Sequence, residues 1–167
     1  MSLSDPAAVG ASKLMSMSEA VRRFVDDGAV VVIEGFTHLI SFAAGHEIIR
    51  QRRRDLVACR LTPDLVYDQM VGMGMARKLI FSYVGNPGVG LLRRVRDSIE
   101  NGWPHPVEFE EHSHAGMANA YEAGAAGLPC AIFRGYRGAG LATVNPNIKS
   151  IECPFTGEKL AAIPAIR

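Results

Sequence analysis

Residues 27–37 read DGAVVVIEGFT, and this stretch decides the fold. Its apolar part is short, β-branched and continuous, which is typical of a strand buried on both faces of a parallel sheet. Gly35 then allows a sharp turn, because it has no Cβ. We expect a ligand to bind at the loop Glu34, Gly35, Phe36 and Thr37, where backbone N–H groups ahead of a helix can hold an anion or a developing oxyanion. An ordinary turn between strand and helix is the alternative interpretation.

Helical and strand patterns alternate along the rest of the chain. The predicted helices cover 16–24, 42–53, 63–70, 91–99 and 116–127; the predicted strands cover 29–33, 56–61, 78–84, 107–111 and 131–136; and an irregular end has apolar stretches at 148–153 and 160–163. Repeated strand-helix-strand units predict an α/β fold with an open, mostly parallel sheet and helices on both faces. Ligands bind at the carboxyl ends of such strands, which selects 34–38, 61–64, 85–90 and 110–114.

The composition is that of a single globular domain: 167 residues, of which 48% are apolar and 21% are charged. We expect 1–15 to be a mobile N-terminal segment and 16–167 to be one α/β domain. Residues 161–166 read like the beginning of a further strand, so we expect that the chain is truncated at its C-terminus or that a partner completes the edge. The net charge of +1 argues against nucleic-acid binding.

The sequence also indicates a cytoplasmic, soluble protein. It has no apolar run of 18 residues and no N-terminal secretion signal, so we expect no membrane partner. Its cysteines are Cys59, Cys130 and Cys153, and no CxxC motif occurs. We interpret them as reduced thiols.

A second candidate site is the strand end Glu110, Glu111, His112, Ser113 and His114. Strand alternation predicts Glu111 and Ser113 on one face, where a carboxylate beside a serine suits a general base or a nucleophile. The opposite face, with Glu110, His112 and His114, could bind a metal. We expect no metal, because His-x-His spacing is common by chance and no further ligand is obvious. A solvated strand end is the other alternative.

A third candidate is the loop 85–90, which reads GNPGVG. Its glycines would let a phosphate or a pantetheine chain run close to the backbone, and we expect Asn86 and Gly88 to lie nearest the ligand. A plain turn chosen for its positive φ angles is equally compatible with this composition.

The order of these segments resembles the α-subunit of class I CoA-transferases, of the glutaconate or 3-oxoacid type. That family carries Asp or Asn-Gly, two residues, three apolar residues and Gly-Gly-Phe, and residues 27–36 follow this pattern. The motif at 110–113 with the later Gly-Leu-Pro at 127–129, and the segment 145–158, also look like the glutaconate type. The resemblance covers 18–167 and implies a fold of the NagB/RpiA/CoA-transferase kind.

The resemblance implies a mechanism in which a glutamate attacks an acyl-CoA thioester and forms a mixed anhydride, which free CoA then attacks. That glutamate belongs to a β-subunit, so the implied assembly is a heterodimer or heterotetramer, with coenzyme A as a substrate and no permanently bound cofactor. The positions implied to bind substrate are Glu34, Gly35, Phe36, Thr37, Asn86, Gly88 and Ser113.

Glu34 departs from the family pattern, since it replaces the first glycine of Gly-Gly-Phe. Some relatives hydrolyse CoA thioesters or open their rings, with an acidic residue at the end of the strand that matches 107–111. Glu111 is then the catalytic base of an alternative function. A non-catalytic domain that binds acyl-CoA is a further alternative.

Overall fold

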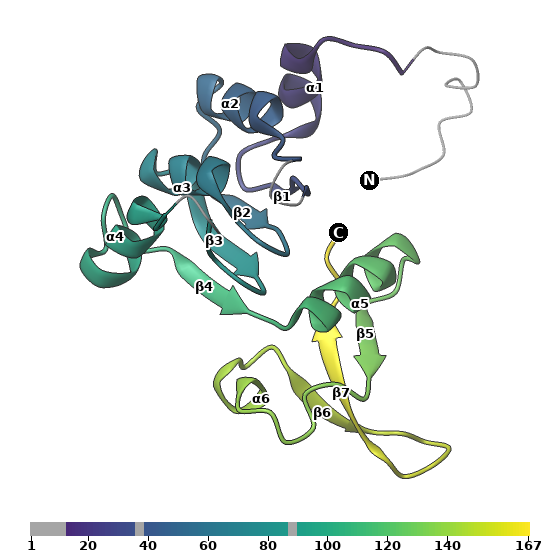
Figure 1. The fold of residues 1–167 in the computed structure, drawn as a ribbon. Coiled ribbons are helices and arrows are strands. Elements are labelled where there is room, and N and C mark those ends of the chain that lie inside the picture. The colour runs from purple at the N-terminus through teal and green to yellow at the C-terminus, as the bar shows by residue number, and fades with distance from the viewer. Residues whose placement is uncertain (1–12, 36–38, 87–89) are drawn as a thin grey trace.

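A computed structural model describes residues 13–35, 39–86 and 90–167, and two sheets organise it (Figure 1). The parallel sheet has the order β1-β2-β3-β4, with β1 (Val30–Val32), β2 (Leu56–Cys59), β3 (Ala76–Phe81) and β4 (Glu108–Glu111). The antiparallel sheet has the order β5-β7-β6, with β5 (Cys130–Phe133), β7 (Lys159–Pro164) and β6 (Lys149–Glu152). The predicted α/β fold is confirmed.

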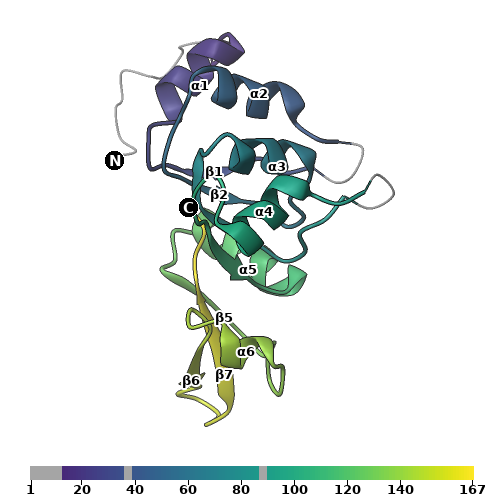
Figure 2. The same cartoon turned by 90° about the vertical axis from the view of Figure 1, so that its left-hand side faces the viewer.

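The helices are α1 (Met17–Phe24), α2 (Phe42–Arg50), α3 (Leu65–Gly72), α4 (Arg93–Asn101), α5 (His114–Ala125) and α6 (Leu141–Val144). Helices α1 to α4 cover one face of the parallel sheet, whereas α5 packs on β5 and β7 (Figures 1 and 2). The antiparallel sheet extends away from the parallel one in both views. Because α5 and the antiparallel sheet follow β4 directly, they meet the parallel sheet near the carboxyl ends of its strands.

The fifth predicted strand also forms, and it belongs to the antiparallel sheet. β5 pairs antiparallel with β7, for example Phe133 with Ala161. Residues 161–166, which read like the beginning of a further strand, overlap β7, the central strand of the antiparallel sheet. Apolar periodicity identifies a strand but does not identify the strand with which it pairs.

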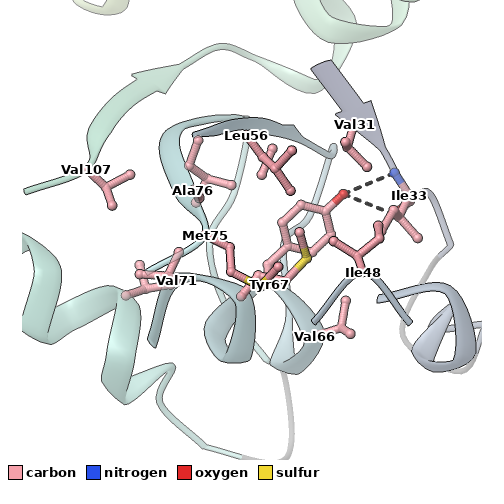
Figure 3. Close-up of a cluster of buried hydrophobic side chains, with 14 of the residues drawn as sticks. Val31, Ile33, Ile48, Leu56, Val66, Tyr67, Val71, Met75, Ala76 and Val107 are labelled. Carbon is pink, nitrogen blue, oxygen red and sulfur yellow. Dashed lines mark hydrogen bonds between the residues drawn. The ribbon is translucent and has the colours of Figure 1, made fainter. Parts of the chain in front are cut away.

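The main core lies between the parallel sheet and its helices, and it fixes the position of the loop after β1 (Figure 3). Tyr67 of α3 is 1% exposed among apolar side chains. Its hydroxyl accepts a hydrogen bond from the Ile33 backbone N–H at 3.1 Å and donates to the Cys59 carbonyl at 2.8 Å. A buried tyrosine hydroxyl needs such partners, and here they join the ends of β1 and β2.

A second, smaller apolar cluster lies under the antiparallel sheet and includes Ala120, Ala131 and Ile163. A single domain over 16–167 therefore stays a prediction, and 1–12 of the expected N-terminal segment lie outside the described residues. All three cysteines are free thiols. None of the helices in the described part of the chain is long and apolar enough to cross a membrane.

Candidate active site

A hollow of about 220 Å³ lies where the ends of three parallel strands meet. It is lined by Glu34, Gly35, Leu61, Thr62 and His114, and we call it the Gly35 pocket. Glu34 and Gly35 follow β1, Leu61 and Thr62 follow β2, and His114 follows β4. The pocket therefore lies at the edge of the sheet where ligands bind in open α/β folds.

Gly35 occupies a position that no other residue fits without moving the loop. Its φ angle is +152°, and a Cβ atom built there would lie 1.9 Å from the carbonyl oxygen of Leu39. The Gly35 carbonyl in turn accepts a hydrogen bond from the guanidinium of Arg60. Gly35 is thus confined on one side by the Leu39 carbonyl and on the other by the Arg60 side chain from the end of β2.

Arg60 is a fully buried cation directly beneath the Gly35 pocket. Its Nη1 lies 2.9 Å from an Asp64 carboxylate oxygen, and its guanidinium lies 5.7 Å from the centre of the Tyr67 ring. Burial raises the pKa of Asp64, although the positive charge of Arg60 opposes that rise. We did not single out Arg60 from the sequence; the signal was a charge directly after the apolar run of β2.

Glu34 does not project freely into the pocket, although its side chain is exposed. One carboxylate oxygen, Oε1, accepts hydrogen bonds from the Leu61 N–H at 2.8 Å and from the Tyr121 hydroxyl at 2.6 Å. The same hydroxyl lies 3.5 Å from the Cys59 thiol, and burial raises the pKa of that thiol to about 12. Glu34 therefore links the end of β1 to β2 and to α5.

His114 is the pocket residue that our sequence reasoning placed elsewhere, on a possible metal-binding face. Its Nδ1 lies 2.8 Å from the Ser82 hydroxyl, which follows β3, and its Nε2 lies 3.4 Å from the Thr62 hydroxyl. It is the first residue of α5, so the change from strand to helix turns it toward the ends of β2 and β3.

The structure does not bring Glu111 and Ser113 to the Gly35 pocket. Glu111 lines a separate hollow of about 390 Å³ with residues of α6, and its carbonyl accepts a hydrogen bond from Asn145 at 2.7 Å. The Ser113 hydroxyl caps α5 by accepting a hydrogen bond from the Gly116 N–H at 3.0 Å. Their roles in catalysis and binding stay predictions.

Asn86 lines another hollow, of about 370 Å³, and its carbonyl accepts a hydrogen bond from the Gly90 N–H at 3.3 Å. The neighbouring Gly85 N–H donates to the carbonyl of Pro63, so this loop lies beside the one after β2. Phe36, Thr37 and Gly88, which we also expect to bind substrate, lie outside the described residues.

Five side chains form a polar group that we call the Glu110 network: Lys78, Glu110, His112, Tyr136 and Asn147. All of them except Tyr136 also line a hollow of about 310 Å³. Glu110, 7% exposed, accepts hydrogen bonds from His112 Nε2 at 2.7 Å and Asn147 at 2.6 Å. It also pairs with the Lys78 ammonium at 2.5 Å, and the Tyr136 hydroxyl lies 3.3 Å from His112 Nδ1. Burial alone raises the pKa of Glu110, but His112 and Lys78 together lower it to about 2.

The proposed metal-binding face is not assembled, because Glu110 and His112 bond to each other while His114 bonds to Ser82 and Thr62. Over residues 13–35, 39–86 and 90–167, no three His, Cys, Asp or Glu side chains are grouped so that they could hold a metal ion.

Sequence comparisons identify relatives of the whole described fold. The model of the coenzyme A transferase family matches residues 14–136. The A-type subunit of 3-oxoadipate CoA-transferase from Pseudomonas knackmussii is 61% identical over 156 residues, which cover 93% of this chain and 55% of that protein. The A-type subunit of glutaconate CoA-transferase from Acidaminococcus fermentans is 29% identical and covers 92% of this chain and 52% of that one. The chain thus spans about half the length of these relatives.

Solved structures agree with this result. The crystal structure of glutaconate coenzyme A-transferase from Acidaminococcus fermentans superposes with a TM-score of 0.80 at 29% identity, over 92% of this chain and 53% of that one. The decarboxylase AibA/AibB superposes with a TM-score of 0.79 at 27% identity, over 90% of this chain and 57% of that one. From these matches, the chain belongs to the coenzyme A transferase family and is of the α-subunit type.

Proposed function

We propose that this chain works as the α-subunit of an enzyme that transfers coenzyme A between an acyl-CoA and a carboxylic acid. The observation that carries the proposal is the 61% identity to the A-type subunit of 3-oxoadipate CoA-transferase, over 93% of the chain. The substrate class that follows from this relative is an oxo dicarboxylic acid. Coenzyme A is a substrate here, and the reaction needs no permanently bound cofactor.

The proposed partner is a β-subunit, in a heterodimer or heterotetramer, because the relatives are named as A-type subunits. Its glutamate attacks the thioester carbonyl carbon, and the C–S bond breaks so that CoA leaves as a thiolate. The thiolate then attacks the glutamyl carbonyl of the mixed anhydride, the first acid leaves as a carboxylate, and CoA is held as a thioester on the glutamate. The acceptor carboxylate attacks this thioester and displaces CoA thiolate. The thiolate attacks the acyl carbonyl of the new mixed anhydride and releases the glutamate carboxylate, so transfer requires no external oxidant or reductant. We place the complex in the cytoplasm, where the free thiols of this chain remain reduced.

The part of this chain in the reaction is to hold the acyl group at the Gly35 pocket. Gly35 is fixed by Arg60 and by the close approach of Leu39, and Glu34 is fixed by Leu61 and Tyr121. Such fixed groups suit catalysis because they need no reorganisation when charge develops on the reacting carbonyl. The hydrolase alternative with Glu111 as base is not favoured, since Glu111 lines a different hollow from Gly35.

The proposal is tested by producing the chain together with the product of the adjacent reading frame as the candidate β-subunit. The purified complex and each of the two chains by itself are mixed with 3-oxoadipate and a panel of acyl-CoA donors, and the CoA thioesters are separated by chromatography. We expect CoA transfer when both chains are present and none with either one on its own. Thioester loss without an acceptor acid would support the hydrolase alternative, and a complex that neither binds nor converts any acyl-CoA would overturn the proposal.

A further inference from the structure

The side chain of His114 is held by one nitrogen while the other faces the Gly35 pocket. The Ser82 hydroxyl donates its proton to the Leu61 carbonyl at 2.6 Å, so toward His114 Nδ1, at 2.8 Å, it can act only as an acceptor. Nδ1 must therefore carry a hydrogen. In a neutral imidazole this leaves a lone pair on Nε2.

The contact on the pocket side of His114 is much weaker. Nε2 lies 3.4 Å from the Thr62 hydroxyl, beyond the usual length of a strong hydrogen bond, and the histidine is exposed. Glu34, the charged side chain that lines the same pocket, already accepts two hydrogen bonds at Oε1. Among the described side chains that line the pocket, His114 and Thr62 are the ones that can donate a hydrogen bond to a ligand, since the Glu34 carboxylate only accepts.

The chemistry of this pair selects a class of ligand. A carboxylate has only acceptor oxygens, so it cannot bond to the lone pair of a neutral imidazole. It can bind once Nε2 takes up a proton, and the imidazolium then donates one hydrogen bond to the Ser82 hydroxyl and one to the carboxylate. The added positive charge also offsets the repulsion between an entering carboxylate and Glu34, while the buried Arg60 below is already paired with Asp64.

We propose that His114 determines specificity by binding the distal carboxylate of a dicarboxylic acid, with Nε2 donating a hydrogen bond to that carboxylate. This inference rests on the proposed function, in which the other carboxylate must reach the glutamate of the β-subunit. Ser82 is a positioning residue, since it acts only through Nδ1 of His114. Thr62 supplies a second donor to the same carboxylate.

The first test compares two acids in the assembled two-chain complex, 3-oxoadipate and 3-oxohexanoate, which differ only in the distal carboxylate. His114→Asn keeps a polar group near Ser82 but removes Nε2. We expect it to lower kcat/KM for 3-oxoadipate about 10- to 100-fold, the size of a lost hydrogen bond to a charged group. The value for 3-oxohexanoate should change less than about threefold. Ser82→Ala should give a smaller loss in the same direction.

The control is His46→Asn, because His46 bonds to Gln69 on the helical face, away from the pocket. If the role of His114 were purely structural, His114→Asn would lower kcat/KM by the same factor for both acids, and that result would overturn the inference. The second readout is calorimetry of acid binding, in which His114→Asn should weaken the Kd for 3-oxoadipate about 10- to 100-fold and the Kd for 3-oxohexanoate less than about threefold. Equal losses for the two acids would refute the role of His114 but leave the proposed function intact, whereas absence of any transfer would refute the function itself.

Discussion

His112 and His114 lie two residues apart at the end of β4, but their surroundings differ. His112 is 4% exposed inside the Glu110 network, with Glu110 on one ring nitrogen and Tyr136 on the other. His114 is exposed at the Gly35 pocket, with one short contact to Ser82 and one long contact to Thr62. Polar groups with complete sets of protein partners stabilise a fold, while incompletely bonded groups beside a hollow can bind a ligand. We therefore expect changes in the network to reduce stability, and changes in the pocket to reduce activity.

The largest effect is expected in the network, from Lys78→Met. This change leaves the buried Glu110 ionised without its cation, and the free energy of unfolding should fall by about 3 kcal/mol. Urea denaturation followed by circular dichroism measures the change. The matched control is Arg96→Met, because the Arg96–Glu100 pair is exposed and should contribute less than about 1 kcal/mol. Equal losses from the two variants would show that the network does not stabilise the fold.

In the pocket, Gly35→Ala should lower CoA transfer by the complex about 100-fold, the cost of misplacing groups by about 1 Å at a reaction centre. The added Cβ collides with the Leu39 carbonyl and must displace the loop. Gly28→Ala is the control, since Gly28 also has a positive φ angle but open space around it. Comparing the two variants distinguishes the effect of the steric clash from the effect of backbone strain. Unchanged CoA transfer by Gly35→Ala would show that this loop takes no part in the reaction.

A smaller effect on the free energy of unfolding is expected when the pH is lowered, because Glu110 of the network then becomes protonated. The folded-state pKa of Glu110, about 2, lies below its ordinary value of 4.5, so its ionised form stabilises the fold above about pH 4.5. This stabilisation is lost as the pH falls toward 2. The difference in unfolding free energy between the wild type and Glu110→Gln should therefore be widest above about pH 5 and shrink below it. A constant difference from about pH 6 to about pH 3 would contradict the lowered pKa.

The smallest effect is expected at Tyr121 of α5, which bonds to Glu34 at the edge of the pocket. Tyr121→Phe removes the hydroxyl that donates to Glu34, and the free energy of unfolding should fall by about 1 kcal/mol. Because Leu61 still holds the Glu34 carboxylate, the loop should keep its position and transfer should fall less than tenfold. Thermal denaturation and the transfer assay measure the two effects, and a larger loss of activity than of stability would assign Tyr121 to the pocket itself.

The apolar run that ends at Gly35 correctly predicted a strand and a sharp turn, but the strand is not buried on both faces, because Val30 and Val32 are 45% and 43% exposed. The expectation that Glu111 and Ser113 share one face rested on strand alternation, which does not extend to Ser113. Alternation of side chains holds only while the backbone is extended, and the strand ends at Glu111. Ser113 is already the cap of α5, and this cap lacks the usual glutamate three residues later because Gly116 stands there.

The contacts of Arg60 and His114 could not be predicted from the sequence for another reason. Both act through partners far along the chain: Arg60 contacts Gly35, and His114 contacts Ser82 and Thr62. Such contacts depend on which strands are neighbours in the sheet. The family resemblance, by contrast, could be predicted because it depends on the order of segments along the chain and not on their pairing.

We propose that the β-subunit supplies the nucleophilic glutamate and that this chain supplies the acyl pocket. The most direct test is to locate the covalent intermediate. The two-chain complex is incubated with acyl-CoA alone, the activated glutamyl group is reduced with borohydride, and both chains are mapped by peptide mass spectrometry. We predict modification of one glutamate of the β-subunit, with Glu34 and Glu111 of this chain unmodified. Modification of Glu34 or Glu111 would place the nucleophile on this chain and contradict its role as the subunit that supplies the pocket.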